Sequence, residues 1–210
     1  MNKPKESQKS GQRSGRPIEL KFLTSAVDMQ GCPADDFPEV AIVGRSNAGK
    51  SSLINGLSNS KIAMVSSTPG KTRLLNFYQG RQFRLVDMPG YGFAQRSGGE
   101  QRDWQSMIEP FLALRGNLVG LLLVMDVRRD WSVDEENLLR WISPRQLPVA
   151  AALTKADKLS RSMMMKRQQM IRKQSGLQFL FPTSALKKQG FVELEEFVFR
   201  DWVRRARGGE

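Results

Sequence analysis

Short apolar runs alternate along this chain with segments of helical periodicity. Runs rich in β-branched and aliphatic residues occupy 40–43, 118–125 and 149–153. Such runs are typical of strands that are buried on both faces of a parallel sheet. Weaker patterns predict an edge strand within 18–26, further strands at 74–78, 82–86 and 178–181, and a tight turn at 79–81.

Helical periodicity fills the intervals between these strands. Trp104, Ile108, Phe111 and Leu112 recur on one face, and a similar stripe runs from Phe191 to Trp202. Helices are therefore predicted at 51–57, 104–112, 134–142, 160–174 and 190–205. This alternation predicts one α/β domain, a doubly wound, mostly parallel sheet with helices on both faces. Polar and glycine-rich stretches predict an exposed loop at 61–72 and a mobile segment through Gly98 and Gly99.

The ends of the chain carry little that could be buried. Residues 1–17 are polar and basic, which predicts a disordered basic arm and not a secretory signal. The folded domain is expected at 18–205, followed by a flexible tail at 206–210. No apolar run reaches membrane-spanning length, so we expect no membrane partner. A single cysteine, Cys32, is consistent with the reducing cytoplasm, and a monomer is expected.

The net charge of the chain and its lack of histidine limit the classes of function that it can have. The chain has 210 residues, a formal net charge of +12 and no histidine. The absence of histidine excludes histidine-based triads and histidine metal sites. A large basic excess favours contact with nucleic acid through phosphate attraction, although charge that only keeps the protein soluble is the alternative.

The sequence Gly44-Arg45-Ser46-Asn47-Ala48-Gly49-Lys50-Ser51 fits the phosphate-loop pattern G-x-x-x-x-G-K-[ST]. It lies between a predicted strand and a predicted helix, as that pattern requires. Its glycines let backbone N–H groups approach a phosphate, and the helix N-terminus favours an anion. Lys50 supplies a cation for the β- and γ-phosphates, and the Ser51 hydroxyl is placed for Mg²⁺.

Further candidate residues follow other strands. Asp87-Met88-Pro89-Gly90 provides a carboxylate that can hold Mg²⁺ through water and a Gly90 N–H for a γ-phosphate. Thr72 can add a hydroxyl to the Mg²⁺ shell, with Thr68 as a competitor, and its loop can act as a switch. Because the carboxyl ends of parallel strands share one edge of the sheet, these groups are expected to converge there.

The base of a bound nucleotide is expected to be recognised by the segment Thr154-Lys155-Ala156-Asp157. A carboxylate can accept two hydrogen bonds from the ring N–H and exocyclic amine of guanine, whereas adenine offers no such pair. The aliphatic stem of Lys155 can cover the base. Ser184 and Ala185 can add a backbone N–H to the guanine oxygen.

Taken together, these motifs resemble those of Ras-like, translation-factor-class GTPases, and within that class the EngB family (the YihA/YsxC group). The resemblance covers about Phe22 to Trp202 and implies a cytoplasmic GTPase that assists assembly of the large (50S) ribosomal subunit, with a link to cell division and septation. It implies Mg²⁺ as cofactor, GTP and GDP as ligands, and the 50S precursor and its rRNA as partners. Lys50, Asn47 and Thr72 are the implied catalytic residues, and Ser51 and Thr72 the implied Mg²⁺ ligands. The implied nucleotide-binding residues are Gly44, Arg45, Ser46, Asn47, Ala48, Gly49, Lys50, Ser51, Gly70, Lys71, Thr72, Arg73, Leu74, Asp87, Met88, Pro89, Gly90, Thr154, Lys155, Ala156, Asp157, Thr183, Ser184 and Ala185.

Two residues bear on the rate of hydrolysis. Tyr91 follows Gly90 near the place where Ras-like enzymes have a water-orienting glutamine, so slow intrinsic hydrolysis is expected. Asn47 resembles the phosphate-loop asparagine that helps hold K⁺ in several related bacterial GTPases. We therefore hypothesise hydrolysis assisted by K⁺ or stimulated by the ribosome, with Arg73 as a rival source of charge.

A second class of function stays open at this point: an rRNA-docking module regulated by nucleotide, with incidental turnover. The predicted basic helix at 160–174 and the arm at 1–17 are the candidates for rRNA contact. The alternative for the helix is a solvated basic face with its methionines directed into the core. A third reading, an ATP-dependent P-loop kinase, is disfavoured by the segment Thr154-Lys155-Ala156-Asp157.

Overall fold

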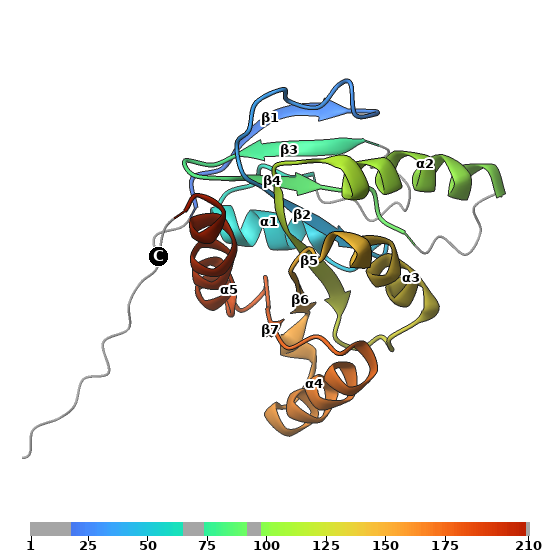
Figure 1. Ribbon diagram of the computed structural model, residues 1–210. Helices are drawn as coiled ribbons and strands as arrows, with labels where there is room; N and C mark the ends of the chain where they lie inside the picture. Colours follow the sequence, from blue (N-terminus) through green and yellow to red (C-terminus); the bar gives the residue numbers. More distant parts are fainter. Residues whose placement is uncertain (1–17, 65–73, 92–97, 209–210) are drawn as a thin grey trace, which may run out of the picture.

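The computed structural model describes residues 18–64, 74–91 and 98–208, with side chains from residue 105 onward in the last range. Within these residues seven strands form one sheet in the order β1-β3-β4-β2-β5-β6-β7 (Figure 1). The strands are β1 (Lys21–Ala26), β2 (Glu39–Gly44), β3 (Leu75–Gln79), β4 (Arg84–Asp87), β5 (Leu118–Asp126), β6 (Val149–Thr154) and β7 (Leu180–Pro182).

Strands β4, β2, β5, β6 and β7 run parallel, whereas β1 pairs antiparallel with β3 and β3 pairs antiparallel with β4. The turn after Gln79 joins β3 and β4 as a hairpin, and β1 is an edge strand that begins at Lys21. The predicted mostly parallel α/β sheet is therefore confirmed. Its antiparallel part lies at one end of the sheet, where a hairpin replaces a helical crossover.

Helices cover both faces of this sheet (Figure 1). Their starts and ends follow local signals: Ser132 caps α3 in a capping box with Glu135, and Ser160 caps α4. Gly176, with φ +71°, ends α4 in the left-handed conformation that glycine adopts without strain. The helices are α1 (Lys50–Ser58), α2 (Gly98–Leu114), α3 (Val133–Ile142), α4 (Arg161–Ser175) and α5 (Phe191–Phe197), with short 3₁₀ turns at Ser143–Arg145 and Ala156–Lys158 and a π-helical segment at Val198–Arg204.

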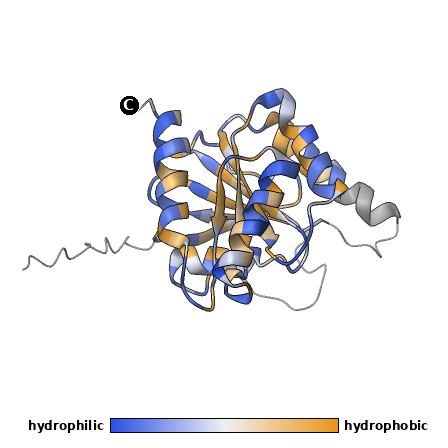
Figure 2. Ribbon diagram, turned by 90° about the horizontal axis from the view of Figure 1, so that it is seen from below, coloured by the Kyte–Doolittle hydropathy of each residue, from blue (hydrophilic) through white to orange (hydrophobic). Residues whose placement is uncertain are grey.

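Each central strand supplies side chains to two cores. Along β2, Ala41 and Val43 join the core beneath α2, α3 and α4. Val40 and Ile42 join the opposite core, beneath α1 and α5. This division explains why the β2 sequence is apolar at successive positions instead of alternating. Figure 2 shows the result, with orange strands inside and blue positions on the outer helix faces.

Two details of the helices differ from the expectations. Gly98 and Gly99, expected in a mobile segment, form the first turn of α2. The chain after α5 continues as a π-helix, which the helical stripe does not distinguish from an α-helix because Leu194, Val198 and Trp202 are still buried on one side. Among the described helices, none has the length and apolar character needed to cross a bilayer.

The methionines of α4 do not form a core face. Met163, Met165 and Met170 are each about half exposed, and the buried residue of the helix is Ile171. Met164 packs against the core as a partly buried side chain. The exposed surface of α4 therefore combines methionines with basic residues.

Candidate functional site

The ends of four parallel strands bring the candidate residues to one edge of the sheet. Strand β2 leads into the phosphate loop, β4 ends at Asp87, β6 ends at Thr154 and β7 leads into Thr183. Their parallel register places these ends side by side, β4 next to β2 and β6 next to β7. Among the described residues, these strand ends lie at the carboxyl edge of the sheet, where the sequence predicted the candidate groups to converge.

The phosphate loop has the backbone expected of a tight anion-binding turn. Asn47 and Gly49 both have positive φ, of 63° and 96°. Ala48 donates its N–H to the Arg45 carbonyl at 3.0 Å, and α1 begins immediately after Gly49. A Cβ at Gly44 would lie 2.3 Å from the Val124 carbonyl oxygen, so only glycine fits against β5 at that position.

Lys50, which is partly buried, and Asp87, which is buried, influence each other electrostatically at the phosphate loop. Burial lowers the pKa of Lys50, against the opposing effect of Asp87. Burial also raises the pKa of Asp87 to about 6, although Lys50 opposes this shift. The Lys50 ammonium donates to the Gly44 carbonyl at 3.4 Å, and Asp87 Oδ1 is buried without a hydrogen-bond partner among the described residues.

That unpartnered oxygen makes the site suitable for a divalent cation. A buried carboxylate oxygen is a hard ligand, of the kind that Mg²⁺ or its bound water prefers. Ser51 lies in the first turn of α1, next to Lys50. Neither Asp87 nor Ser51 belongs to a cluster of three or more acidic or cysteine side chains in the described chain.

Thr154 and Lys155 attach the phosphate loop to the end of β6. The Thr154 hydroxyl lies 2.5 Å from the Ala48 carbonyl and 2.9 Å from the Met125 carbonyl. Lys155 adopts the left-handed conformation, and its ammonium donates to the Asn47 carbonyl at 2.9 Å. The same ammonium forms an ion pair of 2.9 Å with Asp126 at the end of β5. Hydrogen bonds from Arg128 and Lys155 outweigh burial and lower the pKa of Asp126.

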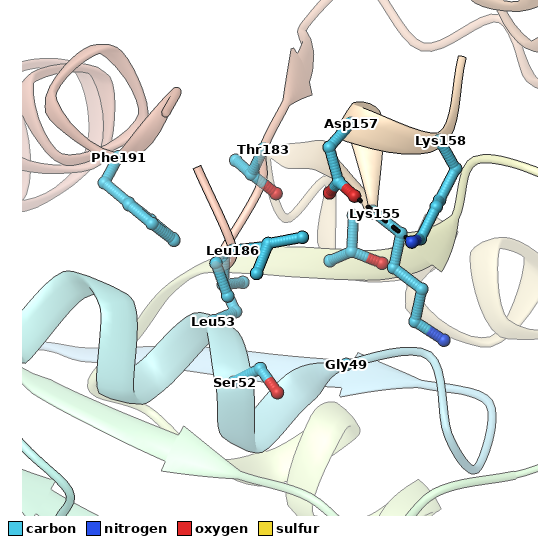
Figure 3. A pocket seen from close by; sticks show the side chains of 11 residues that line it. Gly49, Ser52, Leu53, Lys155, Asp157, Lys158, Thr183, Leu186 and Phe191 are labelled. Carbon is cyan, nitrogen blue, oxygen red and sulfur yellow. Dashed lines mark ion pairs between the residues drawn. The ribbon is translucent and has the colours of Figure 1, made fainter. Parts of the chain in front are cut away.

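A pocket of about 200 Å³ opens between these strand ends and α1 (Figure 3). Ser184 donates to Asp157 Oδ1 at 2.6 Å and lowers the pKa of that carboxyl, so Asp157 remains a charged acceptor beside the pocket. Lys158 forms an ion pair of 3.7 Å with the other oxygen. The Thr183 hydroxyl, buried in the pocket lining, has no hydrogen-bond partner among the described residues. The lining residues are Gly49, Ser52, Leu53, Thr154, Lys155, Asp157, Lys158, Thr183, Ala185, Leu186 and Phe191.

Gly90 lies against the phosphate loop at the other side of the site. A Cβ built on Gly90 would lie 3.0 Å from the Ser46 nitrogen and 3.1 Å from the Lys50 ammonium. Tyr91, which follows it, is held by backbone hydrogen bonds to Gly44 and Ser46. Met88 is buried in the core below α2 and contributes packing there.

Part of the predicted site lies outside the described residues. Thr68, Gly70, Lys71, Thr72 and Arg73 belong to this part, so the structure does not test their proposed roles. Leu74 is partly buried just before β3. The described candidate residues lie around one edge of the sheet, as predicted.

Sequence reasoning missed two groups that contact this edge. Asp126 ends β5 and pairs with Lys155, and its position after an apolar run was the available signal. Glu135 contacts Tyr91 from α3, and its only local signal was the capping-box spacing to Ser132.

Comparison with known proteins agrees with this geometry. A family profile described as "50S ribosome-binding GTPase" matches residues 39–155. A probable GTP-binding protein EngB from Bdellovibrio bacteriovorus is 52% identical over 90% of this chain and 94% of its own. The EngB relative from Pelotomaculum thermopropionicum is 44% identical over 87% of this chain and 94% of its own.

Solved structures show the same fold. A crystal structure of a probable GTP-binding protein EngB superposes with a TM-score of 0.66 over 80% of this chain and 100% of its own, at 23% identity. A structure of Era in complex with MgGDPNP and 16S ribosomal RNA matches with a TM-score of 0.66 at 26% identity, over 79% of this chain and 56% of that one. The family profile and the closely matching relatives, together with the phosphate loop and the pocket at Asp157, show that this chain belongs to the EngB family of GTP-binding proteins, which are P-loop GTPases.

Proposed function

We propose that this protein uses the edge of its sheet as a Mg²⁺-dependent GTP switch in assembly of the large ribosomal subunit, and that this activity is needed for normal cell division and septation. The observation that carries the nucleotide assignment is the pocket between the phosphate loop and Asp157. Its acceptor carboxylate, its Lys155 stem and the buried Thr183 hydroxyl provide both apolar cover and polar contacts. The description of the family profile supports the ribosomal partner.

Different residues of the site bind the phosphates, the Mg²⁺ ion and the guanine base. Backbone N–H groups of the phosphate loop and the Lys50 ammonium neutralise phosphate oxygens. Ser51, Asp87 and Thr72 would hold Mg²⁺, which supplies charge stabilisation for the transferred phosphoryl group. Asp157 accepts from the guanine edge, and Ser184 orients that carboxylate by donating to it. Because a buried polar group left unpaired is costly, adenine should be rejected.

The test of the nucleotide assignment is the affinity of the purified protein for GTP, GDP and ATP. The unmutated chain should prefer guanine nucleotides, because Asp157 needs two donors. Asp157→Asn should lose that preference and gain affinity for xanthosine nucleotides, whose ring carbonyl matches the amide. Equal affinity of the unmutated protein for ATP and GTP would contradict the guanine assignment.

The second candidate, an rRNA-docking module with incidental turnover, is favoured by the surface of α4. This helix carries five basic residues and no acidic residue within Arg161–Ser175. Arg167 is held by Asp130 and by the Val127 carbonyl, whereas Lys166 and Lys173 are exposed. Exposed methionines beside them add an adaptable apolar surface. Charge complementarity therefore supports contact with an RNA phosphate backbone.

One measurement distinguishes these candidates, and a second tests the α4 surface itself. Hydrolysis of GTP should rise when large-subunit particles are added if the protein is a ribosome-stimulated switch, and should not change if turnover is incidental. For RNA contact, Lys166→Gln with Lys173→Gln should weaken binding to large-subunit rRNA and reduce the salt dependence by about one unit of slope per lost contact. Arg200→Gln with Arg204→Gln, on the opposite side of the sheet, is the charge-matched control. Equal losses in both double variants would argue against a specific α4 surface.

A further inference from the structure

Tyr91 is attached to the phosphate loop through its backbone. Its N–H donates to the Gly44 carbonyl at 3.3 Å, and its carbonyl accepts from the Ser46 N–H at 3.0 Å. These bonds form a parallel bridge between Arg45 and Tyr91, beyond the end of the β2–β4 ladder. The residue after Gly90 therefore follows the phosphate loop closely.

The side chain of Tyr91 extends in another direction, into the protein. Its hydroxyl donates to Glu135 Oε1 at 2.9 Å. Both partners are almost fully buried, with 7% of Tyr91 and 1% of Glu135 exposed. A buried hydrogen bond to a carboxylate is stronger than one between neutral groups at a surface.

Glu135 is itself held firmly at the start of α3. Its second oxygen accepts from the Ser132 backbone N–H at 2.9 Å and lies in contact with the Ser132 hydroxyl. Arg45, from the phosphate loop, reaches the same helix end through Ser132 at 3.3 Å and Asp134 at 3.6 Å. The start of α3 is thus linked by side chains both to the phosphate loop and to the residue after Gly90.

Gly90 has little freedom between these attachments. A Cβ at this position would lie 3.0 Å from both the nitrogen and the hydroxyl oxygen of Ser46. The backbone of Gly90 therefore lies close to the phosphate loop. A small displacement of Tyr91 would change which groups the Gly90 N–H can reach.

We propose, on the basis of the proposed nucleotide function, that Tyr91 is a positioning residue, whose buried bond to Glu135 holds the Gly90 N–H where a γ-phosphate can accept it. The phenol does not orient the attacking water, because its hydroxyl is occupied by Glu135 on the α3 side. Burial and the Glu135 carboxylate raise the pKa of Tyr91 well above its ordinary value, so the hydroxyl stays protonated and continues to donate. Tyr91 therefore acts through Gly90 and does not replace a catalytic glutamine.

The distinguishing measurement compares GDP with the non-hydrolysable analogue GDPNP. Only GDPNP carries a γ-phosphate, so only its affinity depends on Gly90. Tyr91→Phe, which removes the hydroxyl alone, should weaken GDPNP binding about 5- to 10-fold, the loss expected for about one hydrogen bond. The affinity for GDP should stay within about twofold, because GDP does not use the γ-phosphate contact.

Two sets of variants distinguish a loss of Tyr91 positioning from a general loss of folding stability. Glu135→Gln keeps one amide oxygen that can accept from Tyr91, although it loses the acceptor for the Ser132 N–H, and should keep the ratio of GDPNP to GDP affinity. Glu135→Leu removes the acceptor and should weaken GDPNP binding selectively. Ile142→Val removes a buried methyl group from the other end of α3 and should leave the ratio of the two affinities unchanged even where it lowers the melting temperature.

Three outcomes would overturn the proposal: equal weakening of both nucleotides by Tyr91→Phe, no change in either affinity, or slower turnover with both affinities preserved. The last result would indicate that the phenol takes part in the chemistry. If the unmutated protein binds neither GDP nor GDPNP, the proposed nucleotide function itself is wrong, and this failure is distinct from the other three.

Discussion

The hydroxyl of Thr154 lies 2.5 Å from the carbonyl oxygen of Ala48, so a side chain at the end of β6 holds the phosphate loop that follows β2. The same hydroxyl is 2.9 Å from the Met125 carbonyl and can donate its single proton to either oxygen. Both contacts are buried. Thr154 thereby links the part of the site proposed to bind guanine with the part proposed to bind phosphate.

Thr154→Val should accelerate dissociation of GDP and GTP by similar factors, about tenfold. The substitution keeps the shape of the side chain but removes the hydroxyl proton that can bond to the Ala48 or the Met125 carbonyl, at a cost of about 1–2 kcal/mol. Stopped-flow release of a fluorescent GDP and of a GTP analogue measures the effect. Thr154→Ser keeps the hydroxyl and should stay close to the unmutated rate. An unchanged rate in Thr154→Val would show that the contact does not support the loop.

Replacing Asn47 should remove any stimulation of hydrolysis by K⁺. The Asn47 carbonyl is occupied by Lys155, but its side chain is exposed at the loop and available to an ion near the phosphates. We expect K⁺ to raise the GTPase rate of the unmutated protein above its rate in Na⁺, and Asn47→Ala to make the two rates equal. An identical K⁺ effect in both proteins, or none in the unmutated protein, would rule out this role.

Arg115→Met should destabilise the fold by about 3 kcal/mol or more without changing nucleotide affinity. Arg115 forms an ion pair of 2.7 Å with Glu39, which is fully buried at the start of β2. The remaining partner of Glu39, Arg84, is 3.5 Å away. Removing one side of a buried pair leaves a charge without sufficient compensation.

Urea denaturation of the apo protein measures the loss in Arg115→Met, and GDP binding serves as the control because Glu39 begins β2 whereas the phosphate loop follows its end. Adding Glu39→Gln should recover part of the lost stability, because the buried charge is then removed. No recovery in the double variant would point to lost packing by the arginine stem as the cause.

Glu195→Gln should stabilise the protein at alkaline pH. Burial, and to a smaller degree the neighbouring Glu196, raise the pKa of Glu195 from 4.5 to about 7. A carboxyl with a raised pKa binds its proton more tightly in the folded state, so its contribution to stability falls as pH rises from 4.5 to about 7. Since the side chain is partly exposed, the expected gain for the variant at about pH 8 is on the order of 1–2 kcal/mol.

Urea unfolding of Glu195→Gln and of the unmutated protein at about pH 5 and about pH 8 tests this linkage. The difference should be clearly larger at the higher pH. Glu196→Gln, at an exposed neighbouring position, is the control and should change the pH dependence only slightly. A difference that does not vary with pH would contradict the assigned titration.

Much of the fold and the described part of the site could be predicted from local patterns. The apolar run at 40–43 predicts a buried strand because both faces of β2 are covered, and the spacing of Gly44, Gly49 and Lys50 predicts the anion-binding turn between this strand and α1. The same holds for Asp157, since its place after a buried strand directs it to the carboxyl edge of the sheet. Each prediction depends on residues within one element and its flanking loop.

Only the tertiary structure decided which distant groups these residues meet. The Thr154 hydroxyl contacts the Ala48 carbonyl 106 positions away, and the Tyr91 phenol donates to Glu135, 44 positions further along the chain. Likewise, periodicity alone could not show that Met163 is exposed, because a methionine stripe suits a core and a binding surface equally. Periodicity and spacing report short-range geometry, whereas hydrogen-bond partners and burial depend on how separate elements pack. The sequence by itself therefore determined the motifs, their order along the chain and the family. The packing of helices against the sheet determined which distant side chains hold each motif in place.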